Sequence, residues 1–136
     1  LRSVPPADAL AVIASFAPAR AADHSETARV LPWLCRPARL APLASRLSAW
    51  QSDAGVVVVA AVTAEQVTIR SVGVPAAIRG QGHARAALQT LASQFAGHRL
   101  CTPVAVPESL AQPLWRSAGM TRREMSQLEL CRTTHR

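Results

Sequence analysis

The residues with the clearest chemical potential form a short segment, Arg79-Gly80-Gln81-Gly82-His83-Ala84, which Arg85 follows. Glycine lets a backbone approach a ligand closely, and basic neighbours favour an anion. A strand pattern precedes the segment at Val67 to Val74, and a helical pattern follows it as far as Phe95. The free N–H groups and the dipole at a helix start attract anions, so this turn predicts a phosphate-binding loop. The alternative is that the glycines serve only the geometry of the turn.

Two carboxylates, Glu65 and Glu108, are candidates for a general base. Glu65 stands at the start of the strand that leads to the loop, and Glu108 opens a later helical pattern. Each also has a structural explanation. Glu65 fits a solvated turn, and Glu108 fits a negative charge that complements a helix dipole.

The cysteines give no metal motif. Cys35, Cys101 and Cys131 are far apart, and the chain has no CxxC, CxxH or HxxxH pairing, so we expect no metal site. Each lies in an apolar context, where a buried free thiol is the usual case. Free thiols favour a reducing, cytoplasmic setting.

The charge balance is basic, with 15 Lys+Arg against 8 Asp+Glu and a net charge of +7. This favours phosphate-rich or acidic ligands, although scattered arginines can also serve only solubility. No aromatic-and-basic motif accompanies them, so we do not expect nucleic-acid binding. No apolar run approaches the roughly 20 residues of a membrane span. The chain starts at Leu1 without a signal-like pattern, and we expect it to be trimmed.

The N-terminal part is expected to contain an edge strand at 1–4, a helix at 7–16 and two short helical pieces between 26 and 50. The helical pieces are short because Pro32, Pro37 and Pro42 interrupt the periodicity. Ser52 to Gly55 is turn chemistry, and the β-branched run that follows is typical of a buried strand. Short links then predict an antiparallel three-strand meander that ends at Val74.

The helix after the glycines should bury one stripe of side chains, made of Ala84, Ala87, Leu88, Leu91, Ala92 and Phe95. Gly97 is a plausible C-terminal cap. A strand at 100–106 would pair in parallel with the strand before the loop, although Pro103 must interrupt its hydrogen bonds. A helix at 108–118 that Gly119 ends, and an antiparallel pair at 120–125 and 127–131, complete one domain over residues 1–136.

This order of elements, with the 79–84 loop, resembles the GNAT superfamily of N-acetyltransferases. The family's loop has Arg or Gln, two variable residues, Gly, one variable residue, then Gly or Ala. Arg79, Gly82 and Ala84 fill those places. Val72-Gly73-Val74-Pro75 matches the usual strand end, and Leu114 to Met120 matches a later segment that commonly ends in Gly-Phe. The resemblance covers about Ser52 to Leu130.

The resemblance implies a mixed α/β (α+β) fold with a mostly antiparallel central sheet, helices on both faces and a splayed parallel strand pair at a coenzyme A site. It implies acetyl-CoA as cosubstrate. The residues that it assigns to acetyl-CoA binding are Val72, Gly73, Val74, Arg79, Gly80, Gln81, Gly82, His83, Ala84, Arg85 and Trp115. The Val74 N–H could stabilise the oxyanion, and Asp23 and His24 could contact the acceptor.

Two positions depart from the family pattern. The tyrosine that serves as general acid in many members corresponds to Trp115, whose indole N–H is not a usable proton source. Position 108, often Asn, is Glu. The sequence therefore predicts an N-acetyltransferase that acts on a small-molecule or peptide amine by direct transfer. The alternative is a degenerate CoA-binding or protein-interaction module of the same fold, and a basic interaction module is a third reading. The acceptor and the oligomeric state, with a homodimer among the options, stay open.

Overall fold

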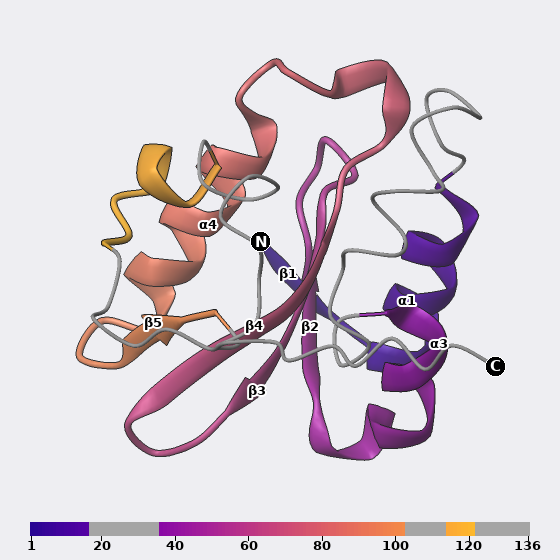
Figure 1. The fold of residues 1–136 in the computed structure, drawn as a ribbon, viewed down its shortest axis with the longest axis horizontal. Coiled ribbons are helices and arrows are strands. Elements are labelled where there is room, and N and C mark those ends of the chain that lie inside the picture. Colours follow the sequence, from indigo (N-terminus) through magenta and orange to yellow (C-terminus); the bar gives the residue numbers. More distant parts are fainter. Residues whose placement is uncertain (17–35, 103–113, 122–136) are drawn as a thin grey trace, which may run out of the picture.

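The computed structural model describes residues 1–16, 36–102 and 114–121. Its elements are β1 (Arg2–Val4), α1 (Pro6–Ser15), α3 (Pro37–Leu40), the 3₁₀ helix η2 (Ala41–Arg46), β2 (Ser48–Gln51), β3 (Val57–Val62), β4 (Gln66–Gly73), the 3₁₀ helix η3 (Ala76–Ile78), α4 (His83–Gln94) and β5 (Arg99–Cys101). Residues 114–117 add one helical turn. Within these residues, the fold is a mixed α+β arrangement around a sheet of five described strands (Figure 1).

The sheet has the order β1-β2-β3-β4-β5, and its first four strands form an antiparallel meander. The β-branched run of β3 lies in the middle, where its first four residues are buried. The β2–β3 turn is closed by a hydrogen bond from the Ser52 N–H to the Val56 carbonyl, 2.9 Å, and Gly55 supplies a φ of +86°. The predicted meander and the edge strand before it are confirmed.

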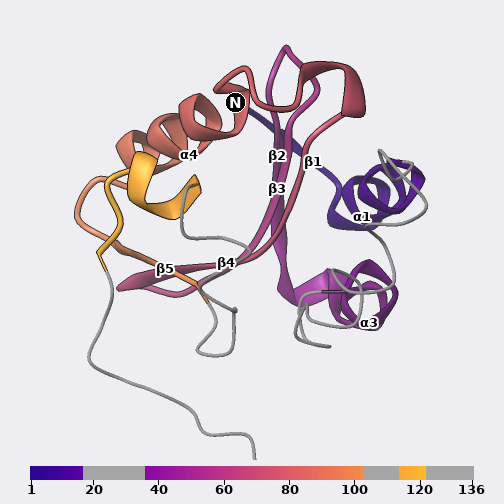
Figure 2. The ribbon, with the colours of Figure 1, turned by 45° about the horizontal axis from the view of Figure 1, so that its top comes forward.

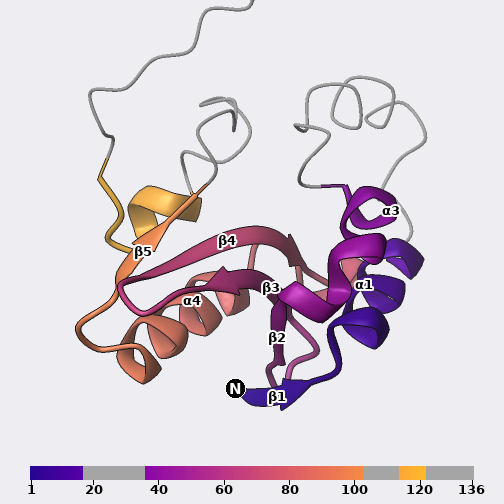
Figure 3. The ribbon, with the colours of Figure 1, turned by 90° about the horizontal axis from the view of Figure 1, so that it is seen from below.

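Helices cover both faces of the sheet, as Figures 2 and 3 show. On one face, α4 places Ala87, Leu88 and Leu91 against alternate residues of β3 and β4. On the other face, α1 and α3 pack on the intervening residues of β2 and β3. This alternation follows from the period of two in a strand, which sends successive side chains to opposite faces.

A parallel crossover connects β4 through α4 to β5. The pairing of β4 with β5 joins Gln66 to Arg99 and ends at Thr68 and Cys101, which are the last paired residues that the structure describes. Just beyond, Val59 pairs with Ser71 while Ala60 pairs with Ile69, so Arg70 is the extra residue of a β-bulge. A bulge bends its strand and increases the local twist. The bend in β4 therefore begins at Arg70, just after the described pairing with β5 ends at Thr68.

Several sequence predictions need correction or lie outside the described residues. Ala92 is exposed, because the fully buried face of α4 contains only Ala87, Leu88 and Leu91. Met120 and Thr121 are not in a strand, since the chain has just turned at Gly119, which has a φ of +87°. The predicted strand residues 103–106, the helix start at 108–113 and the strand positions 122–131 lie outside the described residues, as does the helical piece before residue 36.

Candidate functional site

The segment between β4 and α4 passes over one end of the sheet (Figure 1). Gly80 and Gly82 have φ values of +76° and +83°, which L-residues with side chains rarely adopt. A Cβ atom built on either glycine would meet no atom of the described residues within 4 Å, so neither glycine is required by close packing within them. The glycines are therefore required by the turn, and they add no side chain at positions 80 and 82. The sequence did not predict η3, which forms the first half of this connection.

Backbone amides gather at this turn. The first turn of α4 has no side-chain cap, and helix geometry leaves its first N–H groups without partners inside the helix. The amides that donate to no described residue include those of Gly80, Gly82, His83, Ala84 and Arg85. Donors at a helix N-terminus, with the positive end of the dipole behind them, can hold an anion. The structure thus brings the loop residues of the sequence prediction together.

Side chains inside the loop hold its shape. The Arg79 Nε donates to the Val74 carbonyl at 3.1 Å, which ties the loop to the end of β4. The Gln81 Nε2 donates to the Ala77 carbonyl at 3.0 Å. Arg85 is exposed on the first turn of α4 and makes no hydrogen bond or ion pair with a described residue. Arg79 and Arg85 therefore differ: one makes an internal bond, and the other is available to a ligand.

The strand end has two faces with different roles. Val72 and Val74 pack against the core under α4. Gly73 faces α1, where an added Cβ would lie 2.7 Å from Ile13 Cγ1 and 2.9 Å from Phe16 Cε2. The absence of a side chain at Gly73 is therefore explained by close helix packing. The Val74 N–H donates to no described residue, so it is available as the oxyanion donor that the resemblance implies.

Trp115 lies in the helical turn at 114–117 and packs, partly buried, against the core under α4. Its Nε1 is buried and has no hydrogen-bond partner within the described ranges. An unsatisfied buried N–H costs free energy comparable to a lost hydrogen bond. Ile78, in η3, contacts the same core cluster. Trp115 and Ile78 therefore pack on the same core cluster, and the assignment of Trp115 to the site stays a prediction.

The two candidate bases are not brought to the loop. Glu65 is exposed in the β3–β4 turn, and its carbonyl accepts a hydrogen bond from the Arg99 N–H at 2.9 Å. The eight residues of β4 separate it from the loop, a length of roughly 26 Å at 3.3 Å per residue. Its position fits the solvated-turn interpretation. Glu108 lies outside the described residues, as do Asp23 and His24.

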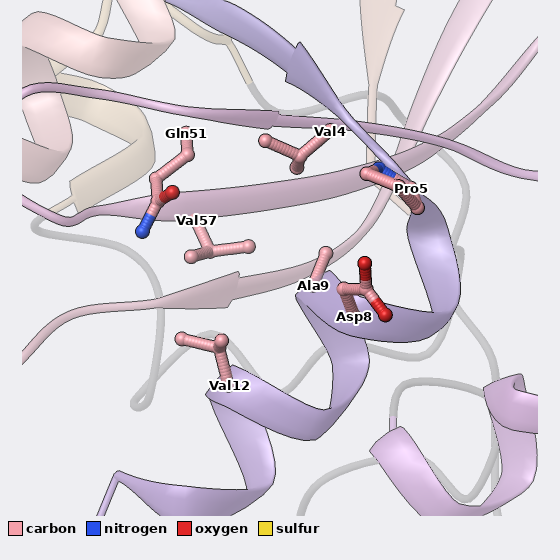
Figure 4. Close-up of a pocket in the computed structure, with 7 residues that line it drawn as sticks. All are labelled: Val4, Pro5, Asp8, Ala9, Val12, Gln51 and Val57. Carbon is pink, nitrogen blue, oxygen red and sulfur yellow. The ribbon is translucent and has the colours of Figure 1, made fainter.

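A surface hollow of about 200 Å³ lies elsewhere, between the first half of α1 and the β1–β3 side of the sheet (Figure 4). Its walls are mainly apolar, and the carboxylate of Asp8 stands at its rim. Gln51 also lines it, and its Oε1 accepts a hydrogen bond from Arg2 at 3.0 Å. The hollow contains none of the predicted site residues. We place the candidate site at the loop, because the loop has the free donors and the hollow has none of the predicted chemistry.

Within the described ranges, no group of three or more His, Cys, Asp or Glu side chains could hold a metal ion. Cys101 is a half-buried free thiol. No helix in the described part of the chain is long and apolar enough to cross a membrane.

Comparisons of the chain with protein-family models, with curated proteins and with solved structures give no significant match. A functional assignment therefore depends on the residues and contacts described above.

Proposed function

We propose that this protein binds acetyl-CoA at the loop between β4 and α4 and transfers the acetyl group to an amine. The observation that carries the proposal is the cluster of free amides at Gly80 to Arg85, on a glycine turn that opens a helix. A pyrophosphate needs several donors that converge without bulky side chains, and glycine turns at helix starts provide them. Arg85 adds a positive charge at the same place.

The strand end supports an extended ligand arm. Beyond Thr68, β4 continues to Gly73, but its described pairing with β5 has already ended. An extended chain can add to such an edge through main-chain hydrogen bonds. The pantetheine arm of coenzyme A carries amides that suit this pairing. A pantetheine that starts at the loop and follows β4 would bring the thioester towards the part of that strand where its described pairing with β5 has ended.

Acetyl-CoA supplies an activated acetyl group when bound. As the amine attacks and the C–S bond breaks, the protein must stabilise negative charge at the carbonyl oxygen and accept the proton of the amine, and coenzyme A leaves as a thiolate that takes up a proton. The Val74 N–H is the proposed oxyanion donor. Among the described carboxylates, Asp8 belongs to α1 and Glu65 to the β3–β4 turn at the far end of β4, whereas Asp53 lies in the β2–β3 turn, which approaches Pro75 at the start of the loop. The proposed base is Glu108, through a water molecule.

A second function is favoured by Trp115. An indole N–H cannot release a proton at neutral pH, and the chain has no tyrosine to replace it. The Nε1 is also buried in the described structure. These observations favour a protein that binds coenzyme A, or a partner, with little turnover.

Calorimetry with acetyl-CoA tests the binding site. The test variant is Gly82→Val, and the matched control is Gly97→Val at the other end of α4. Both glycines have a positive φ, +83° and +95°, so the backbone strain is similar, and an added Cβ at either position would lie more than 4 Å from every atom of the described residues. We expect Gly82→Val to abolish binding and Gly97→Val to preserve it. Equal affinities in the two variants would contradict the site.

Release of the coenzyme A thiol across a panel of amines tests turnover. Acetyl-dependent thiol release with at least one amine supports the transferase. Tight binding without release for any amine supports the degenerate module. A protein with no affinity for coenzyme A would be neither, and the basic interaction module would then stand.

A further inference from the structure

The side chain of Arg79 lies beside the candidate anion site, but it donates a hydrogen bond to the backbone of the same connection. Its Nε donates to the Val74 carbonyl at 3.1 Å, across the 3₁₀ turn of η3. The same connection is closed by two backbone bonds, from Ile78 N–H to the Pro75 carbonyl at 3.1 Å and from Arg79 N–H to the Ala76 carbonyl at 3.4 Å. The Nε bond links the residue directly before the glycines to the end of β4.

The far end of this link is fixed. Val74 packs on the core under α4. Pro75 stands against the β2–β3 turn, where a Cβ on Gly55 would lie 3.3 Å from Pro75 Cγ. The near end is Gly80, whose conformational freedom is the largest of any residue type. A bond from Arg79 to a fixed carbonyl therefore limits the positions that the following amides can take.

We propose that Arg79 is a positioning residue, whose Nε bond to Val74 sets the loop amides for the pyrophosphate, and that its charge is secondary. The exposed Arg85 supplies the charge instead. This inference rests on the proposed binding of acetyl-CoA. The two arginines then have different roles. At position 79 the hydrogen-bond donor Nε orders the loop, and at position 85 the positive charge attracts the pyrophosphate.

Side-chain topology allows a sharp test. In arginine the Nε is bonded to Cδ, and in glutamine the Nε2 is also bonded to Cδ, so Arg79→Gln retains a donor at the same place without the charge. Methionine has a similar length and neither donor nor charge. The same pair of substitutions at Arg85 is the matched control. Because all four changes are on exposed side chains, we expect the variants to fold, and thermal melts check this.

The first readout is the affinity for acetyl-CoA at two salt concentrations. We expect Arg79→Met to weaken binding about tenfold and Arg79→Gln to stay within about threefold of the wild type, as one retained hydrogen bond would give. At position 85, Gln and Met should weaken binding equally and reduce its salt dependence. Equal losses for Arg79→Gln and Arg79→Met would overturn the proposal, and so would no loss in either.

The second readout does not need a ligand. Hydrogen exchange of the Ile78 and Gln81 amides, both bonded within the loop, reports on the loop's order. We expect faster exchange in Arg79→Met and unchanged exchange in Arg79→Gln. The same rates in both variants would overturn the proposal. If the wild type does not bind acetyl-CoA, the proposed function fails, whereas this exchange pattern still decides whether Arg79 positions the loop.

Discussion

Gly73 offers a prediction in which a structural role and a ligand role give different results. Its φ is outside the positive region, so Gly73→Ala imposes no backbone strain. The added Cβ would lie 2.7 Å from Ile13 Cγ1 and 2.9 and 3.0 Å from two ring atoms of Phe16. Carbon atoms prefer a separation of about 3.5–4.0 Å, so α1 must move away from β4 by close to 1 Å. Overpacking of this kind costs about 1–3 kcal/mol of unfolding free energy.

The assay is urea denaturation followed by circular dichroism, with Gly73→Ala measured alone and together with Ile13→Ala. The second change removes the nearest atom, so the two should couple favourably by about 0.5–1 kcal/mol or more. Gly80→Ala is the control: it should lose about 1 kcal/mol to backbone strain, and Ile13→Ala should not recover it. If Gly73→Ala kept the wild-type stability and lost acetyl-CoA affinity instead, close packing would not be the reason for this glycine.

Three other predictions follow from the structure. Leu88→Ala and Leu91→Ala, both on the fully buried face of α4, should each cost about 2–5 kcal/mol in the same denaturation assay, whereas a loss below about 1 kcal/mol would mean that this face is not part of the core. If the general acid stands at position 115, Trp115→Tyr should raise the rate of thiol release about tenfold or more. Trp115→Phe is the control, because phenylalanine has no proton to give. Equal rates of thiol release in the Tyr and Phe variants would exclude an acid role for this position. Gly55→Val should destabilise the β2–β3 turn by about 1–2 kcal/mol through its positive φ and its contact with Pro75, and thermal melts check it against Ala54→Val.

Much of the fold could be predicted from local patterns. The β-branched run of β3, the turn at Ser52 to Gly55 and the glycines at 80 and 82 are strong local signals, and they correctly predicted the meander, the turn and the start of α4. The short links fixed the antiparallel order, because a tight turn cannot connect parallel strands. The crossover to β5 followed from the single helix between two strands.

The parts that could not be predicted depend on tertiary contacts. Gly73 matched a strand end in the sequence, but its reason is the approach of Ile13 and Phe16 from a helix nearly sixty residues earlier. The bulge at Arg70 leaves no local signal. The link from Arg79 to Val74 depends on the 3₁₀ turn that the sequence did not show.

The candidate site also has a part that the sequence predicted, the loop, and a part that it did not place correctly, the candidate base Glu65. The glycines and the helix start identified the loop, because an anion site made of backbone groups is encoded by where the chain turns. In the sequence, Glu65 is a candidate because it stands at the start of the strand that leads to the loop, but a strand is extended, and β4 puts its two ends far apart. Proximity in sequence predicts proximity in space across a turn and predicts the opposite along a strand.

The most direct test of the central claim is an amide-resolved NMR titration of the protein with acetyl-CoA. We predict that the largest shifts fall on the amides of Gly80, Gly82, His83, Ala84 and Arg85, with further shifts from Val72 to Val74. Saturable binding with these amides unchanged, or with shifts confined to the hollow beside Asp8, would contradict the proposed site.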